Sequence, residues 1–410
     1  MTALTRELWF LSKDRSAQVW LLIAFAAASF AVLFGLQEVS SQRDTIERLK
    51  AADTIEREVA IEEYQDWGSA AYYTFHLTYD APSEFTFAAL GQRDTAPWKH
   101  RIRMLALEGQ IYETDAPNPD FALIGRFDYA FVVAILSPLF LILLLHDLRA
   151  SEKANGRYEL LDATDEGVWR IRAGLRLAAV SIVLLLPLWV AALLSGASGV
   201  QVFVASAAVL LHLTFWWAVI AWINAHGWTA PINLTTLFGV WLALAIVAPA
   251  GIKIAVDSAV AVPDGGDIVL TQRETVNDAW DLPVSATMDP FLERHPEWAD
   301  YATMEGTFEW KWYYAFQQVG DQTVEPLSIA YRDGRMRRDG LSAMLSWLSP
   351  PAKIERVFQS LSQTDTSAAA TYENRVRTFH AELRDYYYPL MFKDAPFTDE
   401  AVSTRPSFSN

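Results

Sequence analysis

The sequence predicts a predominantly α-helical polytopic membrane protein with five spans and two mixed α/β regions outside the membrane. The main observation is that residues 177–252 contain no Asp, Glu, Lys or Arg. A water-soluble helix keeps one face charged, whereas a membrane span needs about 20 apolar residues, so this stretch has the length of three spans. Two further apolar runs, at 19–36 and 128–146, predict two more spans.

Two polar breaks divide the long uncharged stretch. Residues 195–199 consist of Ser, Gly and Ala, and residues 224–231 contain Asn, His, Gly and Pro, which favour turns. The predicted spans are therefore 177–195, 201–223 and 233–255, and residues 224–232 form a short loop.

The first apolar run follows a basic segment that contains Arg6, Lys13 and Arg15. A secretory signal peptide has the same order of features. We interpret residues 19–36 as a retained span, because the run is longer than a usual signal core and the chain continues as a helix beyond it. Basic residues favour the cytoplasmic side, which makes residues 1–18 a cytoplasmic N-terminus. In the second run, Pro138 predicts a kink.

The loop at 147–176 decides the predicted orientation. It is short and rich in arginine, so it should stay in the cytoplasm. Counting crossings from this loop places residues 37–127 and 256–410 on the other side and residues 224–232 in the cytoplasm. In a Gram-negative cell this means the inner membrane, with two large periplasmic regions.

The two outer regions carry different patterns. Residues 37–66 predict a helix that extends the first span, and the aromatic residues after Gly68 predict strands and loops. In the tail, residues 267–273 are strand-capable, whereas helices are predicted from Leu341, over 352–361 and over 366–387. The aromatic cluster at 308–314 predicts either a buried core or a surface that binds a partner.

Several kinds of chemistry have no support in the sequence. The chain has no cysteine and a net charge of -16, which argues against thiolate sites and against a nucleic-acid partner. It contains no P-loop, no HExxH helix and no GxSxG turn, and its seven histidines form no metal-binding pair. We therefore expect no catalytic residues, no metal and no cofactor in this chain.

Two polar residues in the predicted spans are candidates for a translocation path. His212 lies in the fourth span and Lys253 at the outer end of the fifth. Ionisable residues inside a membrane often mark such paths. The alternatives are that His212 is a hydrogen-bonded packing residue and that Lys253 extends its ammonium group to the headgroups.

One stretch resembles a known family. Residues 127–133 read FDYAFVV, residues 136–139 read LSPL, and residues 146–161 read HDLRASEKANGRYELL. They resemble the second span and following cytoplasmic loop of type-2 ABC exporter permeases, of the group with large periplasmic regions related to multicopper-enzyme maturation permeases. The residues in the family's positions, or beside them, are Glu152, Lys153, Gly156, Arg157, Leu160 and Leu161.

Two features depart from that family. It has six spans, whereas five are predicted here, and a proline often follows the Leu-Leu pair, where this chain has Asp162. The tail is nevertheless similar in its Leu348, Ser349 and Pro350, which precede helices.

The resemblance implies a permease subunit that works with a separate ATP-binding cassette ATPase, which would hold the ATP and Mg. It also implies a second permease copy or a homologous permease, the lipid bilayer, and a periplasmic protein as a further candidate partner. The 147–176 loop would then be the coupling element. We expect Gly156 to permit the chain reversal within it and Glu152 to pair with a basic residue of the ATPase. The alternatives are that the loop only determines topology, or that the protein is a membrane-anchored scaffold or sensor that does not transport.

Overall fold

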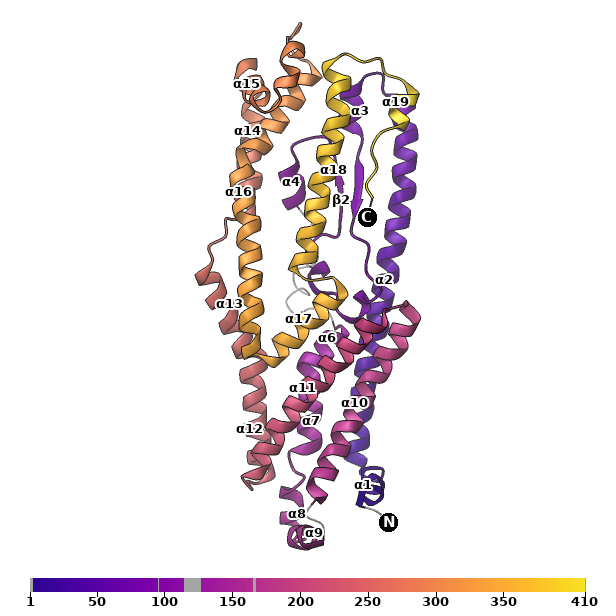
Figure 1. Ribbon diagram of the computed structural model, residues 1–410, viewed down its shortest axis with the longest axis vertical. Helices are drawn as coiled ribbons and strands as arrows, with labels where there is room; N and C mark the ends of the chain where they lie inside the picture. The colour runs from indigo at the N-terminus through magenta and orange to yellow at the C-terminus, as the bar shows by residue number, and fades with distance from the viewer. Residues whose placement is uncertain (1–2, 95, 114–126, 165–166, 410) are drawn as a thin grey trace.

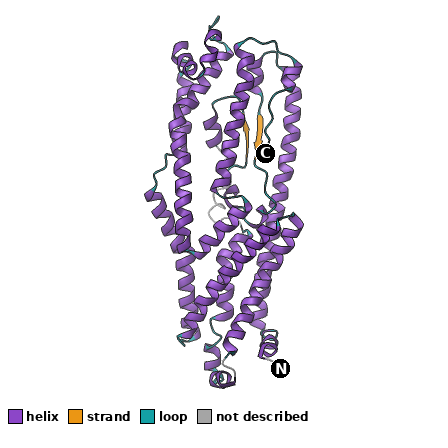
Figure 2. Ribbon diagram, in the orientation of Figure 1, coloured by secondary structure: helices purple, strands orange, loops and turns teal. Residues whose placement is uncertain are grey.

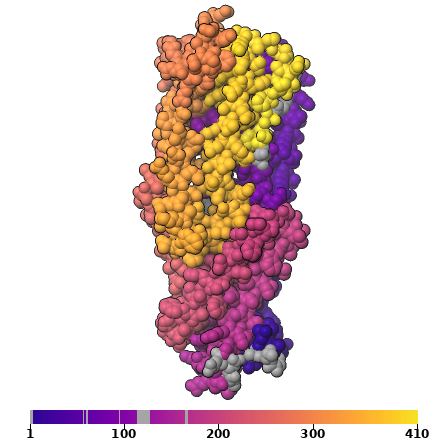
Figure 3. Space-filling view, in the orientation of Figure 1, coloured from indigo at the N-terminus to yellow at the C-terminus, as the bar shows by residue number. Residues whose placement is uncertain are grey.

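The computed structural model describes residues 3–94, 96–113, 127–164 and 167–409, and it is almost entirely helical (Figures 1 and 2). The molecule is elongated. A bundle of apolar helices occupies one half and the tail occupies the other (Figure 3). Residues 114–126 of the first predicted periplasmic region lie outside the described residues.

Five helices are long and apolar enough to cross a membrane, which confirms the five predicted spans. The second and fifth are assembled from shorter segments, and all five are longer than predicted. They are Arg15–Glu56 within α2 (Arg15–Glu63), Tyr129–Ala154, which includes α6 (Tyr129–Phe131), α7 (Ser137–Leu145) and α8 (Ala150–Ala154), Val168–Ser195 (α10), Gly199–Ala225 (α11), and Ala230–Ala259, which includes α12 (Ala230–Leu242) and α13 (Ala248–Ala259).

The prolines in two spans follow π-helical turns. Val132–Leu136 precedes Pro138, and Ala243–Val247 precedes Pro249. A π-helical turn absorbs the missing backbone hydrogen bond without breaking the helix. The Trp241 indole donates to the Ile135 carbonyl at 3.0 Å, so the fifth helix satisfies a backbone group of the second at its bend.

The first span continues as one helix far beyond the apolar bundle, as the sequence predicts. At 1.5 Å per residue, the 49 residues of α2 extend about 74 Å. Near its middle, Gly35 allows the carbonyl of Phe87 to approach closely, because a Cβ at position 35 would lie 2.0 Å from that oxygen. The 3-10 turn η1 (Thr86–Ala88) thereby packs directly on the α2 backbone.

The far half is a single unit built from both outer regions, not two mixed domains. Its first region supplies α3 (Trp67–Tyr73), η2 (Gly91–Asp94), α4 (Leu107–Tyr112) and an antiparallel pair of strands, β1 (His76–Tyr79) and β2 (Lys99–Ile102). Trp67, Ile102 and Leu107 pack with Tyr314 and Leu383 of the tail in one hydrophobic core. Neither region therefore has a core of its own.

The tail is helical in the described residues, so the mixed α/β prediction was wrong for it. Asp264 caps α14 (Gly265–Asp278), which includes the segment that we expected to form a strand. The helix predicted from Leu341 begins already at Trp310. The remaining tail elements are α15 (Val284–Arg294), η5 (Pro296–Tyr301), α16 (Trp310–Leu345), η6 (Ser346–Leu348), α17 (Pro350–Ser362), α18 (Thr366–Phe392) and α19 (Asp399–Ser403).

The aromatic cluster at 308–314 mostly belongs to the core. Tyr314 is fully buried and Trp312 nearly so, whereas Phe308 is exposed. This observation favours the core interpretation over a surface that binds a partner.

The short helix α17 joins the tail to the apolar bundle. Its Phe358 is fully buried and contacts the rings of Tyr129 and Phe85, at centroid distances of 5.6 and 6.4 Å. Tyr129 in turn donates a hydrogen bond to the Leu184 carbonyl of the third span at 3.0 Å. The tail is therefore packed on the membrane-spanning helices rather than tethered by a linker.

Buried polar groups hold the far half together. Arg377 donates two hydrogen bonds to Glu108, at 2.8 and 2.9 Å. Burial alone would raise the pKa of Glu108, but the bonds from Arg377 outweigh it and lower the pKa. Asp321 accepts from the backbone N–H groups of Leu107 and Glu108, the first turn of α4, and pairs with Arg384. These pairs connect α4 with α16 and α18.

The buried His380 predicts acid sensitivity of this half. Its Nε2 donates to the Arg103 carbonyl at 3.2 Å, and burial together with the Arg384 charge holds its pKa well below the ordinary value. Below about pH 6.5 the unfolded chain therefore binds a proton that the folded chain does not, so stability falls as the pH falls. Through this residue, the free energy of unfolding should fall by up to about 1.4 kcal/mol for each unit that the pH is lowered.

The measurement is the thermal unfolding midpoint of the full chain between pH 7.5 and 5. We expect His380→Gln to lose less stability than the wild type over this range, whatever its stability at pH 7.5. The control His226→Gln changes an exposed histidine at the opposite end. Equal pH dependence of the wild type and His380→Gln would contradict the assignment.

Candidate functional site

The loop between the second and third spans lies at the end of the molecule opposite the tail (Figure 1). It contains α8 and α9 (Tyr158–Thr164), joined by a reversal at Gly156. Gly156 has a φ of 68°, in the left-handed region that favours glycine, and its N–H bonds to the Lys153 carbonyl at 3.0 Å. The predicted role of Gly156 in the chain reversal is confirmed.

The two other predicted cytoplasmic segments lie at the same end. A Cβ at Gly227, in the turn between α11 and α12, would lie 3.0 Å from the Lys153 ammonium nitrogen. Asn233 donates to the carbonyl of His146 at 3.1 Å. The N-terminal helix α1 (Ala3–Leu11) packs against α10. The three segments therefore form one surface, as the predicted order of crossings requires.

A stack of rings and cations attaches the loop to the start of α10. The buried Trp169 ring stacks on Tyr158 at 5.2 Å, and Lys153 lies 4.9 Å from the Tyr158 ring centroid. The guanidinium groups of Arg149 and Arg172 lie 5.8 and 5.5 Å from the Trp169 ring. Such contacts are each worth about 0.5–2 kcal/mol.

A chain of ion pairs makes the attachment charge-dependent. Arg172 on α10 donates from Nε to Glu7 at 2.7 Å and from its terminal nitrogen to Glu152 at 3.0 Å. Glu152 also accepts from Arg157 at 2.8 Å. The Glu7 side chain is only 1% exposed and the Arg172 side chain 10%. One buried cation therefore joins α1, the loop and the third span.

Helix α1 is placed by this network. Glu7 faces inward, whereas several apolar side chains around the rest of α1 are exposed, namely Leu4, Leu8, Trp9 and Phe10. Such a helix is typical of the membrane interface. In the turn after α1, Asp14 pairs with Arg176 at 3.0 Å, which gives α10 a second connection to the N-terminal segment.

The structure corrects the expected role of Glu152. We expected this carboxylate to face a basic residue of a partner, but its side chain is 14% exposed and both oxygens are bonded within the chain. Glu152 therefore stabilises the loop. Of the six predicted coupling residues, four are exposed, namely Lys153, Gly156, Arg157 and Leu160. Leu160 is 68% exposed. Leu161 is half-buried.

The candidate translocation residues do not come together. His212 is buried among the apolar helices, near Trp216 and the backbone of Ala134. Lys253 lies in α13, where it pairs with Asp257, and its side chain is 77% exposed. His212 is thus a buried residue and Lys253 an exposed one, so the two lie in different environments.

Three residues of the network were not identified as site residues from the sequence. Glu7 lies more than 150 residues before the other two in the chain. Trp169 and Arg172 belong to a basic segment whose residues did not stand out in the sequence. The available signal was an acidic residue within an apolar N-terminal helix, which needs a buried partner. Among the described residues, no group of three or more His, Asp or Glu side chains is arranged to hold a metal ion.

Comparison with known proteins gives one match. Residues 268–410 match a family model described as Domain of unknown function (DUF3526). No curated protein and no solved structure matches the chain. The matched segment begins within α14 and continues through α16, α17 and α18, so this similarity concerns the tail and not the loop.

The buried ion network predicts an asymmetry between substitutions. Arg172→Ala leaves two carboxylates without their shared cation, one of them fully buried, and should lower stability by about 3–5 kcal/mol. Arg43→Ala removes an exposed pair with Glu84 and should cost less than about 1 kcal/mol.

The check is thermal unfolding of the full chain in detergent, together with protease cleavage within residues 147–167. We expect faster cleavage in Arg172→Ala only, and partial recovery when Glu7→Gln is added. Equal stability of the two single variants would mean that the network does not hold the loop.

Proposed function

We propose that this chain is the membrane-spanning permease subunit of an ABC transporter, driven by a separate ATPase subunit that docks on the α8–α9 loop. The observation that supports this most is the rigid attachment of the loop to α10 and α1. A displacement of the loop then moves long helices as rigid bodies, which is one of the established modes of conformational coupling. The resemblance of residues 127–161 to type-2 ABC exporter permeases supports the same proposal.

The continuity of the helices gives the movement a route. From Val168, next to the loop, α10 runs without interruption to Ser195, and it packs along α2. From the apolar bundle, α2 continues into the far half, where it contacts β1 and α19. Work done at the loop would thus reach the tail, either to export a substrate or to act on a protein outside.

In this proposal the chemistry belongs to the partner. The ATPase holds ATP and Mg and hydrolyses the nucleotide, while this chain contributes no catalytic residue. A second copy or a homologous permease completes the translocation unit. The N-terminus lies in the cytoplasm, the membrane is the bacterial inner membrane, and the tail lies in the periplasm.

A second candidate is a membrane-anchored scaffold or sensor that binds a protein partner without transport. One observation favours it. At the far end, a cavity of about 620 Å³ is lined by aromatic residues, including Trp67, Phe308 and Trp310. Aromatic side chains are enriched at protein interfaces. The absence of a bound ATPase would favour this candidate.

The coupling proposal predicts that the exposed part of the loop decides ATPase binding. Leu160→Asp places a charge in an apolar contact and should weaken docking by about tenfold or more. The matched control Ile55→Asp makes the same kind of change at an exposed position of α2 in the far half. Glu152→Arg is a poor test, because it breaks the internal network.

The measurement is made on the tagged full chain purified from its own host. A polypeptide labelled by 8-azido-ATP is quantified, together with ATP hydrolysis. We expect both in the wild type and in Ile55→Asp, and a large loss of both in Leu160→Asp with unchanged thermal stability. Full retention in Leu160→Asp would argue that the loop only determines topology.

The orientation predicts which positions a membrane-impermeant thiol reagent reaches. The chain has no cysteine, so single substitutions give no background. In intact spheroplasts, Ser367→Cys and Ala52→Cys should be labelled, whereas Ser151→Cys should be labelled only after lysis. Labelling of Ser151→Cys in intact spheroplasts would reverse the proposed orientation.

A further inference from the structure

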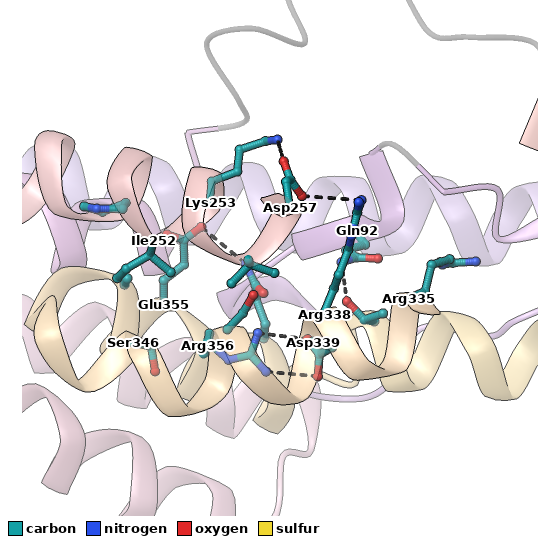
Figure 4. Close-up of a pocket in the computed structure, with 16 residues that line it drawn as sticks. Gln92, Ile252, Lys253, Asp257, Arg335, Arg338, Asp339, Ser346, Glu355 and Arg356 are labelled. Carbon is teal, nitrogen blue, oxygen red and sulfur yellow. Dashed lines mark hydrogen bonds and ion pairs between the residues drawn. The ribbon is translucent and has the colours of Figure 1, made fainter. Parts of the chain in front are cut away.

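A charged cavity lies where the tail meets the last membrane span. It is an open cavity with a volume of about 470 Å³, lined mainly by residues of α13, α16 and α17 (Figure 4). Pro249, Ile252 and Val256 form an apolar wall on α13. The other walls carry charged side chains, and the lining cations are Lys253, Arg335, Arg338 and Arg356.

The charges at the mouth of this cavity do not balance. Arg356 forms a two-bonded pair with Asp339, at 2.9 and 3.1 Å, and Arg335 pairs with Glu373 at 2.7 Å. Lys253 and Arg338 instead share the single carboxylate of Asp257, which lies 3.4 Å from Arg338. One positive charge at the mouth is therefore left over.

The only other acidic side chain in the lining forms no ion pair with these cations. Glu355 takes part in no ion pair with a described residue, and it accepts a hydrogen bond from Gln359 at 3.2 Å. Burial raises its pKa above the ordinary value. The mouth of the cavity thus offers two cationic side chains that share one carboxylate, and Arg338 also donates from Nε to the Val260 carbonyl at 3.0 Å.

The surroundings place the cavity at the membrane surface. Ser349 donates to the Leu244 carbonyl within the fifth span at 2.7 Å, so the end of α16 reaches the apolar bundle. Three large apolar side chains near this contact, Met344, Trp347 and Leu348, are more than 60% exposed. Exposed apolar residues with an interfacial Trp are typical of a surface that faces lipid.

The position of Lys253 along the fifth apolar helix agrees with this placement. Lys253 lies nine residues after Leu244 in the same helical segment, about 13 Å further along the axis at 1.5 Å per residue. Counted from Ala230, where this helical segment begins, Lys253 lies 23 residues or about 35 Å along the axis, which exceeds the roughly 30 Å of the hydrocarbon core. The charged cavity therefore lies beyond the end of that core, where the phosphates of the headgroups begin.

We propose that this cavity binds the phosphate of a membrane phospholipid from the leaflet on the side of the tail. Lys253 and Arg338 donate charge-assisted hydrogen bonds to the phosphate oxygens, and Asp257 holds the two cations in position. The acyl chains lie along the apolar face of α13 and over Met344 and Trp347. A bound lipid would thus join α13, α16 and α17, the helices that connect the tail to the bundle.

The test uses the full chain in detergent, equilibrated with dioleoyl phosphatidylglycerol, with bound lipid counted by native mass spectrometry. We expect Lys253→Ala with Arg338→Ala to lower occupancy about tenfold or more, and Lys253→Arg with Arg338→Lys to retain most of it. The matched control is Lys50→Ala with Arg294→Ala, which removes one Lys and one Arg from ion pairs elsewhere. It should bind lipid like the wild type.

Two outcomes would overturn the proposal. One is equal lipid occupancy in the double alanine variant and the wild type. The other is complete displacement of the lipid by sn-glycerol 3-phosphate, which would assign the site to a soluble phosphate compound. If the double variant does not fold, Lys253→Gln alone is used, and an unchanged occupancy in that variant would count equally against the site.

Discussion

The ion pairs of the buried Arg172 guanidinium hold together the end of the molecule that carries α1 and the α8–α9 loop. The guanidinium lies between Glu7 and Glu152, and each of these carboxylates belongs to a different segment of the chain. Taking such groups out of water is costly, and removing Arg172 would leave Glu7 only its pair with Arg6 and Glu152 only its pair with Arg157. The N-terminal helix, the loop and the third span therefore hold their positions together or not at all.

This mutual dependence gives the loop a mechanical property. A solvated loop that only reverses the chain would not need a buried Trp169, a stacked Tyr158 and two ion pairs to one arginine. These contacts make the loop an extension of α10. At the other end of the bundle, Phe358 on α17 packs against Tyr129 of the second span, so the tail is held by apolar contacts where the loop is held by charges.

The fold could be predicted from the sequence where a single segment contains the whole signal. Each span is such a case, because apolar length and flanking turns are local properties. The tail shows the limit. Residues 267–273 contain β-branched residues and suggest a strand, but they form part of α14, where Ile268 and Gln272 face α16 and α4. Tertiary packing outweighed local propensity there. In the loop, the sequence identified the charged residues but not their pairing, since Glu152 bonds to Arg172 and Arg157 within the chain.

By itself, the sequence determined that the chain is a membrane protein with five apolar helices, that the first helix extends beyond the bundle, and that a charged loop reverses at Gly156. These features depend on residues close together in the chain. Only the tertiary structure decided that Glu7 and Arg172 meet, that both outer regions share one core, and that Lys253 and Arg338 share the carboxylate of Asp257. The reason is physical. Charges and aromatic rings separated by tens to hundreds of residues interact only after the helices pack, and no pattern along the chain specifies which pairs will form.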